Sequence, residues 1–379
     1  METVRFGIVG AGGMGNGHAR NMPHIPEAEL TAVCDISPEA LSYATETYGV
    51  PGFEKHVDLL DSGLVDAILV ATPHYFHPPI SIDAMERGIH VISEKPMAVT
   101  VSGAEAMIKA AERTGVIFAV MFQQRTLPVH QAAKRLVEEG LLGPLYRTLL
   151  IDAHFRSQAY YDSAGWRATW KGEGGGVLLN QAPHGMDIFT WLAGMPARVS
   201  ARVNTRQHDI EVEDEATALL EYENGAIGYF LESVNEYPTG MRIELAGELG
   251  KLVIQDDTLH FWEVIPGVRA ASDGVEAMWG HPEAKEVAVE LEPQQTGHAA
   301  IVANVARAIM HGERLISPGP DAIYSLELAN AILLSGHTGE PVTLPVDRAA
   351  YDAFIEGKQA TSQEKQVEDQ RITDPDHVA

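Results

Sequence analysis

Two segments of the 379-residue sequence carry side chains suited to acid–base chemistry. Lys95 stands between an acid and a proline, directly after the apolar stretch 90–93. If that stretch is a parallel strand, Lys95 leaves its carboxyl end, where open α/β sheets bind ligands, and partial desolvation lowers its pKa. Asn180 and His184 are four residues apart, so they share one face if the segment is helical. Oxidation of an alcohol needs such a base and a cation for the developing alkoxide. The alternatives are a surface lysine and a buried, hydrogen-bonded helix histidine.

A glycine-rich turn follows the first apolar stretch, residues 4–9. Gly10 permits a tight turn, Gly12 lets a diphosphate approach the backbone, and Gly15 allows close packing of strand and helix. Asp35 follows Gly15 by twenty residues, which completes a dinucleotide-binding fingerprint. The predicted cofactor contacts in this turn are Gly10, Gly12, Gly13, Met14 and Gly15. The alternative is an ordinary glycine-rich turn between a strand and a helix.

Asp35 favours NAD over NADP. Its carboxylate can accept hydrogen bonds from both hydroxyls of the adenine ribose and would repel a 2′-phosphate. Residues 36–38, Ile-Ser-Pro, provide no cation to bind that phosphate. The alternative for Asp35 is a solvated turn residue.

The motif Glu94-Lys95-Pro96 and the segment 174–187, GGGVLLNQAPHGMD, resemble signatures of the Gfo/Idh/MocA family. That family contains NAD(P)-dependent sugar and cyclitol oxidoreductases, including glucose–fructose oxidoreductase and inositol dehydrogenase. Segments 325–331 and 341–347 also resemble the family, so the resemblance extends to about Ala350.

The resemblance implies roles for the residues introduced first. His184 matches the proton acceptor of the family, and Lys95 would bind the reacting hydroxyl. The family's Asp is replaced here by Asn180, which can orient His184 by a hydrogen bond but cannot stabilise an imidazolium as a carboxylate does. We therefore expect a weaker base than in Asp-containing relatives, or a larger share of proton transfer by Lys95.

The loop Ala71-Thr72-Pro73-His74 resembles the family's loop beside the cofactor. The cofactor contacts predicted from this loop and from the lysine motif are Ala71, Thr72, His74, His77, Glu94 and Lys95. Two histidines on a loop, with no further ligand nearby in the sequence, are a weak metal signal, so we expect no metal site.

Aromatic residues and arginines gather just before residue 174. Aromatic faces pack on the C–H faces of sugar rings, and arginines donate to hydroxyls or carboxylates. The predicted substrate contacts are Lys95, Arg125, Tyr160, Trp166, Arg167, Asn180 and His184. The alternative for Tyr160 is a core aromatic of the sheet.

The elements that must position these residues fall into two groups. Strands predicted at 4–9, 30–34, 65–71, 90–93 and 116–121 alternate with helices such as 80–87 and 102–114, which indicates a doubly wound parallel sheet. After a helix at 129–139, strands dominate: 145–155, 198–205, 216–222, 227–231, 242–245 and 251–255. One helix is predicted at 177–192 and another at 325–336. Strands without a helix after each indicate a largely antiparallel α+β domain.

These groups predict a Rossmann domain at 1–123, an α+β substrate and oligomerisation domain at 124–357, and a loose polar tail at 358–379. The open face of the second sheet needs a cover if it is apolar, and the resemblance implies another subunit, so we expect a homodimer or homotetramer.

The net charge of −26 makes nucleic acid and anionic membranes improbable partners, because an acidic surface repels phosphate. The single Cys34 excludes an internal disulfide. The first strand starts without a basic and apolar leader, and no apolar run is long enough to span a bilayer, so we expect a soluble cytoplasmic protein.

The leading hypothesis is an NAD-dependent dehydrogenase acting on a secondary hydroxyl of a sugar, glycoside or cyclitol. The rivals are a lyase or glycosidase that retains NAD, a reductase working in the opposite direction, and a non-catalytic dinucleotide sensor. The presence of both Lys95 and His184 favours an enzyme.

Overall fold

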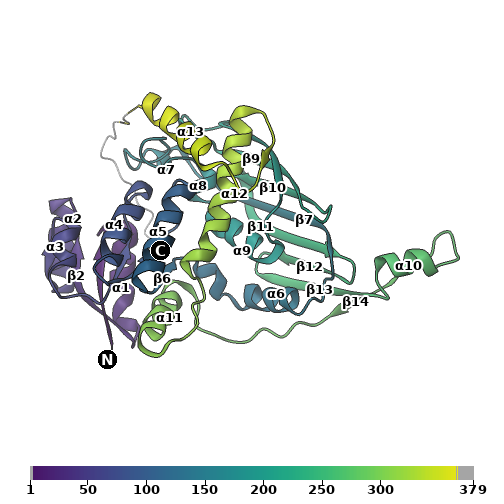
Figure 1. The fold of residues 1–379 in the computed structure, drawn as a ribbon, viewed down its shortest axis with the longest axis horizontal. Coiled ribbons are helices and arrows are strands. Elements are labelled where there is room, and N and C mark those ends of the chain that lie inside the picture. The colour runs from purple at the N-terminus through teal and green to yellow at the C-terminus, as the bar shows by residue number, and fades with distance from the viewer. Residues whose placement is uncertain (1–2, 364, 366–379) are drawn as a thin grey trace.

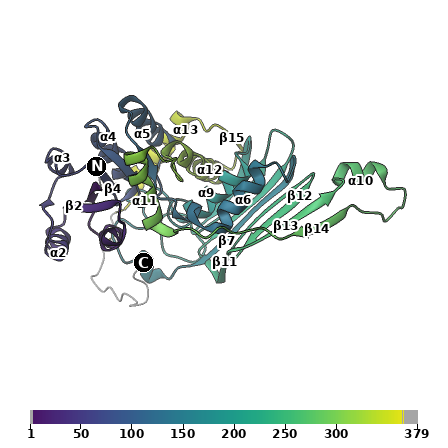
Figure 2. The same ribbon diagram turned by 90° about the horizontal axis from the view of Figure 1, so that it is seen from below.

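The structure, a computed structural model, describes residues 3–363 and 365 and contains two sheets (Figures 1 and 2). The first sheet has six strands in the order β3-β2-β1-β4-β5-β6, all parallel. Its strands are β1 (Val4–Val9), β2 (Ala28–Cys34), β3 (Gly52–Phe53), β4 (Ala67–Val70), β5 (His90–Ser93) and β6 (Phe118–Val120). The predicted doubly wound parallel sheet is confirmed.

Helices connect these parallel strands, as a parallel sheet requires. They are α1 (Gly13–Asn21), α2 (Pro38–Tyr48), α3 (His56–Leu60), α4 (His77–Met85) and α5 (Val101–Thr114). Strand β4 is buried at all four positions, and β1 at five of six, because helices cover both faces. The carboxyl end of β1 leads into the glycine turn, that of β4 into the loop at Ala71, and that of β5 into the turn with Lys95.

The second sheet has nine strands in the order β14-β13-β12-β11-β7-β10-β9-β8-β15. Among the described strands of this sheet, only β7 and β10 pair in parallel, which confirms the mostly antiparallel prediction. The strands are β7 (Leu145–Phe155), β8 (Arg198–Asn204), β9 (Glu215–Glu221), β10 (Ile227–Ser233), β11 (Asn235–Gly247), β12 (Gly250–Gln255), β13 (Thr258–Ile265), β14 (Glu283–Val287) and β15 (Val342–Thr343).

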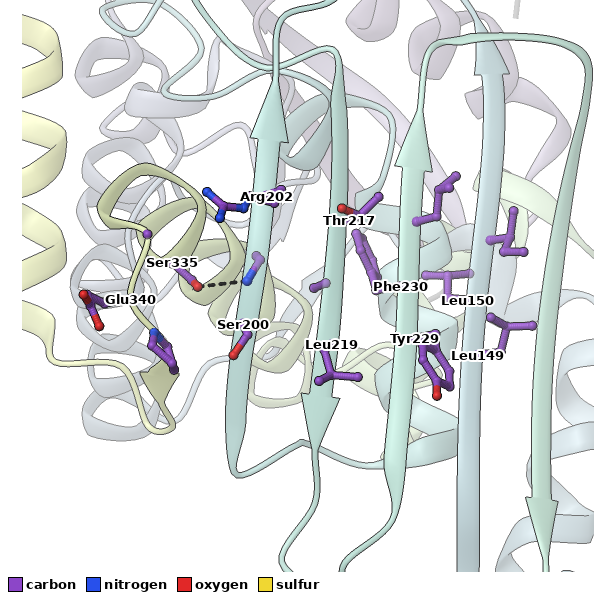
Figure 3. Close-up of a pocket in the computed structure, with 16 residues that line it drawn as sticks. Leu149, Leu150, Ser200, Arg202, Thr217, Leu219, Tyr229, Phe230, Ser335 and Glu340 are labelled. Carbon is purple, nitrogen blue, oxygen red and sulfur yellow. Dashed lines mark hydrogen bonds between the residues drawn. The ribbon is translucent and has the colours of Figure 1, made fainter.

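Helices cover one face of this sheet (Figures 1 and 2). They include α6 (Pro128–Glu138), α8 (Val177–Asn180), α9 (Pro183–Ala193) and α12 (Gly319–Thr338). On another part of the sheet surface, a hollow exposes apolar side chains, including Leu219 and Tyr229, which are 39% and 49% exposed (Figure 3). The short helix α10 (Val268–Gly274) projects from the body between β13 and β14 (Figure 1).

Helix α11 (Gly297–His311) belongs to the core of the first sheet, although it lies far along the chain. Its residues Ile301, Val305 and Ala306 share one buried cluster with Val4 and Phe6 of β1. Sequence analysis predicted no helix here. The boundary predicted at residue 123 therefore does not enclose the whole core of the Rossmann sheet.

The C-terminal prediction needs one correction. Helix α13 (Arg348–Thr361) continues four residues into the predicted tail and carries the buried Tyr351 and Ile355. Of the rest of that tail, residues 364 and 366–379 lie outside the described residues. Within the described part of the chain, no helix combines the length and the apolar character that crossing a membrane requires.

Candidate active site

The glycine turn after β1 is too tight for side chains at two positions. Gly10 has φ +96°, and a Cβ there would lie 2.5 Å from the carbonyl oxygen of Ala71. A Cβ on Gly15 would lie 1.8 Å from the carbonyl oxygen of Gly10. The turn, the loop after β4 and the start of α1 therefore pack backbone against backbone, which only glycine permits.

Gly12 and Gly13 differ, because a Cβ at either position would meet no atom within 4 Å. Gly12 is the N-cap of α1 and supplies no side-chain hydrogen bond to the first turn. The amides at this helix end are thus open to an anion, which the positive end of the helix dipole favours. The open cradle fits the diphosphate of a dinucleotide.

Asp35 lies beside the same turn. Its carboxylate accepts a hydrogen bond from the amide of Ala11 at 2.6 Å and another from the amide of Ser37 at 2.8 Å. These bonds hold the carboxylate at the end of β2, next to the glycine cradle. Two backbone donors thus fix the predicted ribose-binding group.

A cavity of about 810 Å³ is lined by residues from loops of the first sheet and from strands of the second. Most of the predicted site residues line it. Those residues are Met14, Ala71, Thr72, His74, His77, Glu94, Lys95, Tyr160, Trp166, Arg167, Asn180 and His184. Gly10, Gly12, Gly13, Gly15 and Asp35 lie at the adjacent turn and do not line the cavity itself.

Lys95 is held by a main-chain contact across the cavity. Its Nζ donates to the carbonyl oxygen of Asn180 at 3.0 Å. The helix predicted at 177–192 is in fact two helices, because Pro183 starts α9 and has no N–H to continue α8. The interruption lies just after Asn180, whose carbonyl oxygen faces Lys95.

The side chain of Asn180 does not orient His184, contrary to the prediction. Its Nδ2 donates to the carboxylate of Glu173, and its Oδ1 accepts from the hydroxyl of Tyr160 at 3.3 Å. The side-chain nitrogen of Gln123 lies 3.3 Å from Nε2 of His184 instead. The prediction was wrong because Glu173 and Tyr160, which sequence analysis did not connect to Asn180, bind its amide group.

The electrostatic environment keeps His184 neutral. Burial and the charge of Lys95 lower the pKa of His184 to about 3. Burial also lowers the pKa of Lys95, although the carboxylates of Glu94 and Glu173 oppose this. A neutral imidazole and a lysine with reduced basicity therefore line one cavity.

Glu94 connects the lysine turn to helix α1. Its Oε1 lies 2.7 Å from Nε2 of His18, and its Oε2 accepts from the amide of Lys95 at 3.1 Å. Burial alone would raise the pKa of Glu94, but the hydrogen bond from His18 and the nearby positive charges lower it to about 2. Glu94 is thus an ionised group that positions Lys95.

His74 and His77 are both buried and bound to main-chain oxygens. Nδ1 of His74 lies 2.9 Å from the carbonyl oxygen of Glu173. The two ring nitrogens of His77 lie 2.8 Å from the carbonyl oxygen of Pro96 and 2.7 Å from that of Thr72. His77 therefore joins the loop after β4 to the lysine turn, and His74 joins it to the segment before the glycine run.

Three predicted substrate contacts form one stack. The guanidinium of Arg167 lies 4.5 Å from the ring centre of Tyr160 and 4.7 Å from that of Trp166. Arg167 also donates to the Tyr160 hydroxyl at 2.7 Å. The stack gives one wall of the cavity both aromatic faces and a positive charge.

Arg125 is not a cavity residue, which corrects the prediction. Its guanidinium is 2% exposed and donates twice to the buried carboxylate of Asp187, at 2.7 and 2.6 Å. A third bond, at 3.2 Å, reaches Asp321. Three of its five N–H donors therefore bind these two carboxylates, and the guanidinium does not line the cavity.

Sequence reasoning missed two features of the cavity. Glu173, which precedes the glycine run, is buried against Asn180 and Arg167, and burial raises its pKa. Asp152 and His154 line the cavity and lie close to Glu232. Glu173 had a local signal, because it stands next to three glycines. The cluster of Asp152, His154 and Glu232 had no local signal, because Glu232 belongs to another strand.

Comparison with known proteins identifies both halves of the chain. Residues 4–122 match the oxidoreductase family NAD-binding Rossmann fold, and residues 130–253 match the GFO/IDH/MocA C-terminal domain. The chain belongs to the Gfo/Idh/MocA family. It is an NAD-binding oxidoreductase of that family, and the open cradle at Gly12 and Gly13 accords with this cofactor.

Individual Gfo/Idh/MocA proteins resemble the chain along much of its length. The rhizopine catabolism protein MocA of Rhizobium meliloti is 30% identical over 58% of this chain and 68% of its own. The scyllo-inositol 2-dehydrogenase (NAD⁺) of Bacillus subtilis strain 168 is 26% identical over 92% of this chain and 98% of its own. The WlbA dehydrogenase from Bordetella pertussis, solved in complex with NADH and UDP-GlcNAcA, superposes with a TM-score of 0.78 at 30% identity, covering 91% of this chain and all of that one.

Proposed function

We propose that this protein oxidises a secondary hydroxyl of a sugar, glycoside or cyclitol to a ketone with NAD. The observation that carries the proposal is one cavity that holds a lysine, a neutral histidine and an aromatic–arginine stack. The names of the relatives support this substrate class, since one is a scyllo-inositol 2-dehydrogenase and another is bound to UDP-GlcNAcA.

Lys95 binds the reacting hydroxyl in this proposal. Its contact with the Asn180 carbonyl and the turn fixed by Glu94 hold the amine toward the cavity. A positive charge there stabilises the oxygen as it loses its proton. NAD, when bound, supplies the acceptor for the hydride that leaves the carbon.

His184 accepts the hydroxyl proton. The imidazole is neutral before reaction, which is the form that a base requires. Gln123 fixes the ring through its contact with Nε2. Its low pKa makes His184 a weak base, and the charge that it gains on protonation is repelled by Lys95. The Lys95 amine, whose pKa burial lowers, accepts the hydroxyl proton in its neutral form and so shares the role of base.

The stack of Tyr160, Trp166 and Arg167 positions the substrate. Aromatic faces bind the C–H faces of a sugar or cyclitol ring, and the guanidinium donates to ring hydroxyls or to a carboxylate. Tyr160 also bonds to Asn180, so a substrate packed on the stack lies close to the carbonyl that holds Lys95.

The exposed apolar hollow on the second sheet supports a homo-oligomer. Its wall includes Ile151, Leu219 and Tyr229, from three different strands. Leu219 and Tyr229 are labelled in Figure 3. Apolar side chains gathered on one face are typical of a protein interface. Sedimentation of the purified chain tests this: a second copy predicts a dimer or tetramer that Leu219→Glu dissociates, and a monomer at micromolar concentration contradicts it.

The function is tested by following reduced nicotinamide absorbance with inositols, monosaccharides, uronic acids and glycosides. Lys95→Met should lower kcat by about 10²–10⁴-fold and still bind NAD. Lys109→Met, on an exposed helix face, is the matched control and should keep full activity. Turnover of a glycoside with NAD retained and no net NADH would replace the proposal with a redox lyase or glycosidase. NAD binding with no reaction on any compound would favour a sensor.

A further inference from the structure

Strand pairing in the second sheet brings together three potential metal ligands. Asp152 and His154 are two residues apart on β7, so their side chains share one face of the sheet. Glu232 on β10 is the direct partner of Asp152 in the parallel ladder. Helix α9 packs against this face, since a Cβ on Gly185 would lie 2.3 Å from Oδ2 of Asp152.

Glu232 is fully buried, and neither of its carboxylate oxygens has a hydrogen-bond partner among the described residues. Nε2 of His154 is buried and also lacks one. Burying a carboxylate without any partner is expensive, and native proteins pair such groups with a cation or a donor. Apart from the ion-pair contacts of His154 with the two carboxylates, no described residue pairs with these atoms, so a bound cation would complete the pairing.

Their spacing matches the coordination shell of a metal ion. Nε2 of His154 lies 3.2 Å from Oδ1 of Asp152 and 3.5 Å from Oε1 of Glu232, and the three ligand atoms lie within 4.8 Å of one another. Ligands at about 2.1 Å from a tetrahedral ion are about 3.4 Å apart. Two carboxylates and a neutral imidazole carry a charge of about −2, which a divalent ion balances.

We propose that Asp152, His154 and Glu232 bind one divalent transition-metal ion, of the Zn²⁺ or Mn²⁺ class. Imidazole suits Zn²⁺, and carboxylates suit Mn²⁺ as well. A proton shared by the two carboxylates is the competing arrangement. It would need a hydrogen bond between a Glu232 oxygen and Asp152, and in the described part of the chain neither Glu232 oxygen has a hydrogen-bond partner.

The proposed ion would have an open coordination position. Three protein ligands leave a fourth place for water or substrate, as in catalytic metal sites. Asp152 and His154 line the same cavity as Lys95 and His184, so that place faces the cavity. The ligand expected there is a hydroxyl or carboxylate oxygen of the substrate. This last role rests on the proposed function, whereas the metal site does not.

The test uses the full chain, stripped with a chelator and without NAD or substrate, titrated with Zn²⁺ in a calorimeter. One ion per chain is expected, and Co²⁺ should give the visible absorption of a bound ion. Glu232→Gln and His154→Asn should each weaken binding by more than the ~10–100-fold that loss of an outer-shell partner costs. Glu215→Gln, on the adjacent strand β9, is the matched control and should bind like the unsubstituted protein.

Thermal unfolding of each variant, without metal, establishes that the chain is folded before it is titrated. Absence of a one-to-one Zn²⁺ site in the unsubstituted protein overturns the proposal. Binding that survives either Glu232→Gln or His154→Asn also overturns it. Because no NAD or sugar is present, none of these results depends on whether the protein oxidises a sugar.

Discussion

Nζ of Lys95 lies 3.0 Å from the main-chain carbonyl oxygen of Asn180. The contact therefore depends on the path of the backbone at the end of α8, whatever side chain residue 180 carries. The Asn180 side chain serves a different purpose, since it joins Glu173 to Tyr160. One residue thus positions the lysine with its backbone and the cavity wall with its amide.

Asn180→Asp tests this division. The new carboxylate would lie against Glu173, whose pKa burial already raises, so two like charges would share a buried site. The pair binds a proton more readily when folded than when unfolded, so the loss of stability should be greatest at pH 8 and shrink toward pH 5. We expect the change to be on the order of 1 kcal/mol in urea unfolding. Asn180→Ala removes the amide that helps to keep Glu173 ionised but adds no charge, so its loss of stability should increase less between pH 5 and pH 8 than that of the Asp variant. A loss of stability in the Asp variant that does not change with pH contradicts the prediction.

His184 should make the folded state sensitive to acid. Burial and Lys95 lower its pKa to about 3, compared with about 6.5 in the unfolded chain. Between these values the unfolded chain binds a proton that the folded chain does not, so this residue's contribution to stability falls with pH. Between pH 7 and pH 5, His184→Gln should lose less stability than the unsubstituted protein, by on the order of 1 kcal/mol. Urea unfolding measures this, with the surface variant His311→Gln as control; identical pH slopes would refute the buried, neutral state.

The two kinds of glycine in the cofactor turn should respond differently to alanine. Gly12→Ala meets no atom, so stability should change by less than about 0.5 kcal/mol while NAD binding weakens. Gly15→Ala places Cβ against the carbonyl of Gly10 and should destabilise the fold by about 1–3 kcal/mol. Thermal unfolding measures the change in stability, and titration of the protein's tryptophan fluorescence with NAD measures the change in affinity. If Gly12→Ala bound NAD with unchanged affinity, the diphosphate would have to lie elsewhere.

Arg125 should matter for stability and not for substrate affinity. Arg125→Met leaves the buried carboxylate of Asp187 without its main partner, which should cost about 3–5 kcal/mol. Adding Asp187→Leu removes the orphaned charge and should restore much of that stability. Denaturant unfolding measures both variants. A rise in KM without loss of stability would instead return Arg125 to the list of substrate contacts.

The parallel sheet and its ligand-binding edge could be predicted because their signals are local. The glycine turn, Asp35 and Lys95 each stand next to an apolar stretch that forms a strand. The break before Pro183 also had a local signal, because proline cannot donate the hydrogen bond that would continue the preceding helix.

The rest depends on contacts between distant segments. Glu232 becomes a neighbour of Asp152 only through the pairing of β7 with β10, which no spacing in the sequence encodes. Arg125 has the chemistry of a substrate contact, and only the folded chain places it against Asp187. Residue type indicated what these side chains could do, and tertiary structure decided what they meet.

The position of helix α11 in the chain delays completion of the Rossmann core during translation. The core around β1 remains incomplete until Ile301, Val305 and Ala306 reach it. During translation the amino-terminal domain usually folds first, but here its last core segment leaves the ribosome after nearly the whole second sheet. Until α11 has been synthesised, one apolar face of the Rossmann sheet therefore stays exposed. A fragment ending at residue 123 would retain that face permanently and should aggregate.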